Sequence, residues 1–150
     1  MHMKPSFGEK KRHIEYTSRP SSYAIIFKEG TSKIAIIQKG VRYFLPGGEI
    51  ENSETKEACL QRELLEELGW EIEVHHYIGN AERYFYAEKE GIYYLNDGHF
   101  YICGKIREHH VPTEDDYILH WVSSSEAQQL LVHDHQQWAV KQAILLCKQK

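Results

Sequence analysis

Residues 45–70 read LPGGEIENSETKEACLQRELLEELGW, which is the most informative stretch of the chain. A Pro-Gly-Gly turn precedes a segment in which four glutamates and one arginine stand at fixed offsets. The pattern predicts a helix from about Glu54 to Leu68, because Ser53 can act as its N-cap and Gly69 is placed to end it. Gly47 and Gly48 should therefore open the loop that precedes the helix.

The predicted helix has two chemically different faces. An α-helix advances about 100° per residue, so Glu63, Glu66 and Glu67 fall within an arc of roughly 100°. An apolar stripe should lie on the opposite side and bury the helix against a sheet; its members are Ala58, Leu64, Leu65 and Leu68. We expect the acidic face to line a cleft.

The acidic face has the chemistry of a divalent-metal site. Like charges three or four residues apart repel by about 0.2–0.5 kcal/mol per pair, and a cation would remove that cost. Mg²⁺ prefers oxygen ligands and typically combines one or two carboxylates with phosphate oxygens. Gly47 and Gly48 allow a backbone carbonyl to approach metal or a backbone amide to approach phosphate. Arg62 can pair with an acidic neighbour or reach phosphate.

Written as spacing, the stretch resembles the box of the Nudix hydrolases at every fixed position: Gly48, Glu54, Arg62-Glu63-Leu64, Glu66-Glu67, Gly69 and the apolar Trp70. The resemblance implies an α/β fold, a Nudix-type α/β/α sandwich around a mixed β-sheet. It also implies a hydrolase that uses Mg²⁺ or Mn²⁺ to cleave a diphosphate linkage in a nucleoside diphosphate linked to a moiety X. Nucleoside triphosphates, dinucleoside polyphosphates and nucleotide sugars belong to this class.

The resemblance also implies roles for residues of the box. Glu66 and Glu67 would be metal ligands, and Glu63 would be a ligand or the general base. Glu54 and Arg62 would support the site, and a carbonyl of Gly47 or Gly48 would touch metal. The candidate catalytic residues are thus Glu63, Glu66 and Arg62, and the candidate metal ligands within the box are Glu63, Glu66, Glu67 and Gly48.

A further carboxylate outside the box is typical of many family members. The acidic run of residues 114–116 precedes a predicted strand at residues 117–122, so Glu114 is the first candidate for an additional metal ligand. The alternative is a solvated acidic turn after Pro112.

The residues that would select X lie outside the box. Tyr84, Tyr86 and Phe100 could stack on a nucleobase, and Gly47 could contact phosphate. Tyr86 stands sixteen residues after Trp70, as a tyrosine does in members that cleave dinucleoside polyphosphates. The alternative is that these rings pack in strands and core.

The rest of the chain predicts strands and helices in alternation. Strands are expected at residues 23–27 and 33–37, which read as a hairpin, and at residues 43–45. Further strands are expected at residues 71–78, 81–86, 99–106 and 117–122, and helices at residues 123–131 and 138–147. A loosely attached polar segment should cover residues 1–20, and the Nudix hydrolase domain residues 21–150.

The composition limits which classes of partner the protein can bind. The chain has 150 residues and a formal charge of −4, so it offers no basic field for duplex DNA. No apolar run approaches the roughly 20 residues that span a bilayer, so we expect a cytoplasmic protein without a membrane partner. Three separated cysteines and ten histidines lack zinc-site spacing, and we expect reduced thiols and solvated histidines. The sequence leaves both a monomer and a homodimer open.

Two other functions are compatible with a domain of this family. A non-catalytic Nudix domain could sense a nucleotide and regulate a partner, but such a domain would be expected to lose box carboxylates, and all are present. An enzyme acting on RNA ends would be expected to show a more basic groove.

Overall fold

The computed structural model describes residues 4–109 and 116–148, and within them the chain forms two sheets and three helices. The elements, in chain order, are β1 (Ser6–Phe7), β2 (Thr17–Ile26), β3 (Ile34–Lys39), β4 (Arg42–Phe44), β5 (Gly47–Glu49), α1 (Lys56–Leu68), β6 (Trp70–Ala87), β7 (Ile92–Glu108), β8 (Ile118–Val122), α2 (Ser124–Leu130) and α3 (Asp134–Lys148).

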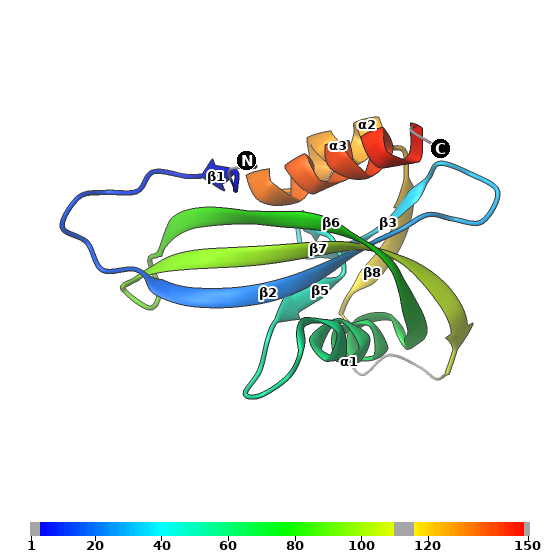
Figure 1. Cartoon of the computed structure of the whole chain (residues 1–150), viewed down its shortest axis with the longest axis horizontal. Coiled ribbons are helices and arrows are strands. Elements are labelled where there is room, and N and C mark those ends of the chain that lie inside the picture. The colour runs from blue at the N-terminus through cyan, green and yellow to red at the C-terminus, as the bar shows by residue number, and fades with distance from the viewer. Residues whose placement is uncertain (1–3, 110–115, 149–150) are drawn as a thin grey trace.

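The sheets are layered between helices, as the sequence predicts. One sheet has the order β1-β6-β7-β2-β5, and the other has the order β4-β3-β8. The first sheet is mixed, because β2 runs parallel to β7 while β6 and β7 are antiparallel. Helix α3 covers one face of this sheet and α1 the other (Figure 1). This confirms the expected α/β sandwich around a mixed sheet.

The continuous apolar runs of β2 and β3 arise because both strands are buried on both faces. Ile25 and Ile36 belong to the core cluster beneath α3, whereas Ala24 and Ile37 belong to the cluster that receives α1. Successive side chains of a strand point to opposite faces, so both alternate sets must be apolar here.

The prediction of a hairpin between residues 23–27 and 33–37 is wrong beyond the first residue pair next to the turn. Phe27 and Ile34 form an isolated antiparallel bridge, after which β2 joins one sheet and β3 the other. The apolar pattern of the two strands fits this arrangement as well as a hairpin, so the pattern alone could not distinguish them.

Strands β6 and β7 form one long hairpin, although the sequence predicted three shorter strands within their span. Residues 71–78 and 81–86 belong to the single strand β6, whose register shifts near Ile72, His76 and Gly79. These irregularities break the alternation of the sequence, which explains why β6 looked like two strands. At Gly79, where φ is +155°, a Cβ atom would lie 3.1 Å from the ring of Trp138.

Helix α1 begins later than predicted, and its buried face overlaps the predicted one only at Leu64 and Leu68. Its N-cap is Thr55, whose side chain accepts a hydrogen bond from the Ala58 amide, rather than Ser53. Gly69 ends the helix with φ of 70°, as expected. The buried residues are Cys59, Leu60, Leu64, Glu67 and Leu68. The predicted stripe was therefore wrong at Ala58, which is exposed, and at Leu65, which is half-buried.

The N-terminal segment is attached to the domain more firmly than its composition predicts. Strand β1 pairs in parallel with β6, and the side chain of Phe7 packs against the core beneath α3. Strand β2 already begins at Thr17. In the described part of the chain, none of the helices combines the length and the apolar character that crossing a bilayer requires.

Candidate functional site

Arg62 is the centre of the acidic face of α1. Its Nε donates to Glu54 Oε2 at 2.7 Å, and its Nη1 donates to Glu63 Oε1 at 3.0 Å and to Glu66 Oε2 at 3.2 Å. Its Nη2 donates to the backbone carbonyl of Glu49 at 3.1 Å and so joins the helix to β5. The hydrogen bond from Arg62, helped by one from the Glu51 amide, lowers the pKa of Glu54 to about 2. The predicted pairing of Arg62 with acidic neighbours is confirmed.

Glu63 is the carboxylate most withdrawn from solvent within the Arg62 ion-pair cluster. Burial raises its pKa to about 7, and the negative charges of Glu66 and Glu51 add to that effect while Arg62 opposes it. Its carboxylate lies directly over Gly48, where an added Cβ atom would stand 2.7 Å from Glu63 Cδ. A side chain at this position would displace the end of Glu63.

Glu67 anchors the other side of the acidic face to the glycine strand. Its side chain is buried, and its Oε1 accepts a hydrogen bond from the Gly47 amide at 2.9 Å. The Gly47 amide, predicted as a phosphate contact, is therefore directed at Glu67. The carbonyl of Gly48 accepts a weak hydrogen bond from the Cys59 thiol at 3.4 Å.

The glycines are held in place by the sheet. Strand β5 pairs with β2, which sets Gly47 opposite Tyr23 and Gly48 opposite Ser22. At Gly47 φ is +140°, and an added Cβ atom would stand 2.1 Å from the Ser22 carbonyl oxygen. Only glycine fits this approach, so the loop before α1 has a fixed path.

The donor set on α1 fits a hard divalent cation. Glu63, Glu66 and Glu67 supply only oxygen, which Mg²⁺ and Mn²⁺ prefer, and Arg62 is the cation that pairs with two of them. Across residues 4–109 and 116–148, however, no three His, Cys, Asp or Glu side chains converge closely enough to hold a metal. The hydrogen bonds explain this, because Glu63 and Glu66 turn to Arg62 while Glu67 turns to Gly47.

The remaining predicted site residues are scattered. Tyr84 packs edge-on against Tyr16 at 4.9 Å, and Tyr86 is 47% exposed near the β6–β7 turn. Phe100 is 0% exposed and stacks on Tyr23 at 5.4 Å, so the prediction that it meets a nucleobase is wrong. It faces inward because its strand is covered by α3. Glu114 lies outside the described residues.

Sequence reasoning missed a basic cluster, which we define as Arg42, Arg83, His133 and His135. The side chain of His135 is 1% exposed and most of His133 is buried, so the prediction of solvated histidines is wrong for this pair. Burial lowers the pKa of His133 to about 4 and that of His135 to about 3. One signal was present in the sequence. Arg83 stands two residues from the apolar Ala81 and two from Phe85, so the three side chains share one face of the strand.

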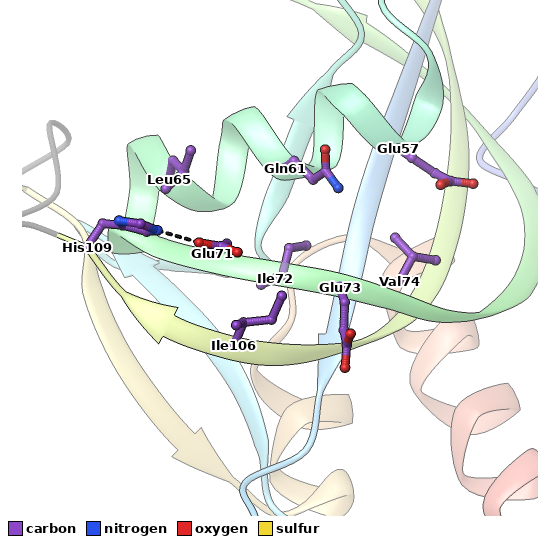
Figure 2. A pocket seen from close by; sticks show the side chains of 9 residues that line it. All are labelled: Glu57, Gln61, Leu65, Glu71, Ile72, Glu73, Val74, Ile106 and His109. Carbon is purple, nitrogen blue, oxygen red and sulfur yellow. Dashed lines mark hydrogen bonds and ion pairs between the residues drawn. The ribbon is translucent and has the colours of Figure 1, made fainter.

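A cavity of about 660 Å³ lies elsewhere, between α1 and the strands β6 and β7. Figure 2 shows Glu57, Gln61 and Leu65 of α1 lining it across from Glu71 and Glu73. Residues 57, 61 and 65 repeat every four positions, which puts Gln61 about 160° around the helix from Glu63. The cavity thus occupies the side of α1 that faces away from Glu63.

Comparisons with known proteins agree with this architecture. The family model of the NUDIX domain matches residues 17–144. A NUDIX hydrolase from Nitrosomonas europaea has a similar structure, with a TM-score of 0.68 and 15% identity over 86% of this chain and 90% of that one. The ORF135 protein of E. coli gives a TM-score of 0.68 with 23% identity, covering 87% and 91% of the two chains.

A MutT NUDIX hydrolase from Burkholderia pseudomallei gives a TM-score of 0.64 with 22% identity, covering 84% of this chain and 98% of that one. At these identities the structural likeness concerns the fold. No curated protein matches the chain in sequence.

Proposed function

This chain belongs to the Nudix family, whose domain spans residues 17–144, and on that premise we propose that it is a metal-dependent pyrophosphohydrolase. Its substrate is a nucleoside diphosphate linked to a further moiety X, and the bond cleaved is a diphosphate linkage. The observation that carries the proposal is the carboxylate face of α1, fixed by Arg62 against the glycine strand β5. Two of the structural neighbours are named hydrolases, which supports the same activity.

We assign the metal to Glu66 and Glu67, with a backbone carbonyl of Gly47 or Gly48 as a further oxygen donor. Bound there, Mg²⁺ or Mn²⁺ would polarise phosphoryl oxygens and offset the negative charge of the diphosphate. In the described structure Glu66 accepts a hydrogen bond from Arg62 and Glu67 accepts one from the Gly47 amide, so metal binding would weaken or rearrange these bonds. Glu114 remains the candidate for an additional ligand.

Glu63 is assigned either as a third ligand or as the group that accepts a proton from the attacking water. Its position supports both roles, because the carboxylate is withdrawn from solvent and lies over Gly48. Arg62 orients it through a 3.0 Å hydrogen bond. Substitution by Gln separates the roles: loss of a base lowers kcat by about 10²–10⁴-fold with unchanged metal dependence, whereas loss of a ligand raises the metal concentration needed.

The test is a substrate panel of nucleoside triphosphates, ADP-ribose, dinucleoside polyphosphates and nucleotide sugars, each with Mg²⁺, Mn²⁺ or chelator. The wild type should turn over at least one of these only with metal, and Glu66→Gln should lose that turnover. Glu57→Gln is the matched control, because Glu57 lies on the same helix but lines the cavity between α1 and the strands β6 and β7. No metal-dependent turnover on any substrate would instead favour a nucleotide-sensing domain.

The same assay tests Glu114. If Glu114 is a ligand, Glu114→Gln should lower turnover at limiting metal and recover part of it at saturating metal. An unchanged metal dependence would remove Glu114 from the site.

A further inference from the structure

The basic cluster of Arg42, Arg83, His133 and His135 has no role in the carboxylate chemistry described above. It is assembled from three separate segments: β4 carries Arg42, β6 carries Arg83, and the histidines stand at the start of α3. Phe44 connects two of these segments, because its ring lies 5.5 Å from the Arg42 guanidinium carbon and 5.5 Å from the His133 ring. The rings of His133 and His135 are 6.0 Å apart.

Within residues 4–109 and 116–148, the two arginines of the cluster form no salt bridge with a carboxylate. Neither Arg42 nor Arg83 makes an ion pair or hydrogen bond to another side chain within the described residues. Arg83 lies with its guanidinium carbon 4.7 Å above the Phe85 ring. Burial lowers the pKa of Arg83, Asp134 partly offsets this, and the positive charge of Arg42 lowers it further. A half-buried Arg83 beside a second positive charge is stabilised by an anion.

The buried histidine adds a hydrogen-bond acceptor without a partner. Asn96 Nδ2 donates to the Arg19 carbonyl and to Ser21 Oγ, so its Oδ1 faces His135 and accepts from His135 Nε2. His135 is neutral at pH 7, so its Nδ1 then carries a lone pair. That nitrogen is buried and has no hydrogen-bond partner. A donor group from a ligand would satisfy this nitrogen.

The cluster adjoins the carboxylate site through Tyr23 and the loop after β4. The ring of Tyr23 lies 6.0 Å from that of His135, and the charge of Glu67 helps to raise the pKa of the Tyr23 hydroxyl, whose burial is the main cause of the shift. Strand β4 ends at Phe44, three residues before Gly47, whose amide binds Glu67. Tyr23 and the loop after β4 therefore connect the basic cluster to the carboxylate face.

We propose that Arg42 and Arg83 bind the phosphate attached to the nucleoside of the substrate, and that the His135 side of the cluster receives a donor group of the nucleoside. The proposal rests on the proposed function for the identity of the substrate, but binding at the cluster requires neither metal nor turnover. A nucleoside 5′-monophosphate carries both features, anionic oxygens for the guanidiniums and N–H or O–H donors for the imidazole nitrogen.

The test measures binding of AMP, GMP, CMP and UMP, of the matching free nucleosides and of inorganic phosphate by calorimetry, all in EDTA. We expect at least one monophosphate to bind more tightly than its nucleoside and than phosphate. Arg42→Gln and Arg83→Gln should each weaken that binding at least about 10-fold, as loss of a charge-assisted contact does. Arg107→Gln is the control, because Arg107 is exposed on β7 and pairs with Glu71.

Steady-state kinetics on the best substrate of the panel complete the test. Both arginine variants should raise KM about 10-fold or more and leave kcat within a few fold, because the contact is present before the chemical step. Arg42 is exposed, so Arg42→Gln should retain the fold even if Arg83→Gln does not. Circular dichroism checks the fold of both variants.

The outcomes separate the two proposals. If the wild type turns over a substrate and both arginine variants keep its monophosphate binding and its KM, the proposed role of the cluster is overturned. The proposed hydrolase activity is then unaffected. If monophosphates bind in a way that depends on the arginines but no substrate is turned over, the binding role of the cluster is supported and the proposed hydrolase activity is overturned. A wild type that binds none of the four monophosphates would overturn the assignment of the cluster.

Discussion

Arg62 is the residue on which the order of the carboxylate face depends. One guanidinium donates to Glu54, Glu63, Glu66 and the carbonyl of Glu49, which only a planar group with five donors can do. The contact to Glu49 ties the helix to the glycine strand, so Arg62 also sets the distance between the carboxylates and the backbone of β5.

Arg62→Lys should therefore keep the charge and lose the geometry. An ammonium group has donors at one point and cannot serve the three carboxylates together with a carbonyl. We expect kcat to fall about 10–100-fold, the usual effect of removing a group that orients metal ligands. Arg107→Lys serves as control, and a kcat equal to wild type in Arg62→Lys would contradict the ordering role.

The two glycines of β5 should respond differently to alanine. At Gly48 the new methyl group would meet the movable end of Glu63, so the fold should survive while Glu63 is displaced and kcat falls at least about 10-fold. At Gly47 it would meet the backbone of Ser22 at a φ of +140°, and about 1–3 kcal/mol of stability or more should be lost. Thermal unfolding and kcat, measured on both variants, distinguish these results. Equal Tm losses would contradict the different roles assigned to the two glycines.

At the scale of the element, α1 shows how far local sequence signals reach. Gly69 ends the helix as predicted, because a left-handed residue there needs no information from elsewhere in the chain. The predicted start of α1 was wrong because Ser53 and Thr55 are both good N-cap residues. Glu54 lies between them and is bound to Arg62 and to the Glu51 amide, which draws it out of the helix.

The cap can be tested by paired substitutions. Thr55→Ala removes the hydrogen bond to the Ala58 amide and should lower the free energy of unfolding by about 1 kcal/mol. Ser53→Ala should change it by less than about 0.5 kcal/mol, because Ser53 is exposed and does not cap the helix. Urea unfolding of both variants checks this, and the reverse order would restore Ser53 as the cap.

At the scale of the molecule, the predictable part of the site is the part contained in one segment. Glu63, Glu66, Glu67 and Arg62 share a helix, so spacing alone indicates that they act together. The basic cluster joins three segments that a long β6–β7 hairpin and a split pair of sheets bring together. Its members could not be grouped from the sequence, because their proximity depends on register and on which strands pair.

Burial of His135 makes the whole fold sensitive to acid. Burial lowers its pKa from 6.5 to about 3, so between those pH values the unfolded chain binds a proton that the folded chain does not. Stability is therefore lost as pH falls below about 6.5, by about 1.4 kcal/mol per pH unit at most. Glu63 acts in the opposite sense, because its pKa is raised to about 7 and protonation favours the folded state.

The contribution of His135 is isolated by comparing wild type with His135→Gln, in which Glu63 is unchanged. From pH 7.5 to pH 5.0 the wild type should lose about 2 kcal/mol more than the variant, measured by urea unfolding in EDTA. Parallel curves for the two proteins would mean that His135 titrates in the folded state as it does in the unfolded chain.

The hydrogen bond from the Gly47 amide to Glu67 gives this domain an internal spectroscopic probe. An amide proton that donates to a carboxylate is deshielded according to the electron density on the accepting oxygen, and a cation bound to Glu67 withdraws that density or breaks the bond. The Gly47 cross-peak in a ¹H–¹⁵N spectrum should therefore shift on titration with Mg²⁺. One backbone resonance would then report metal arrival at the site before any substrate is known.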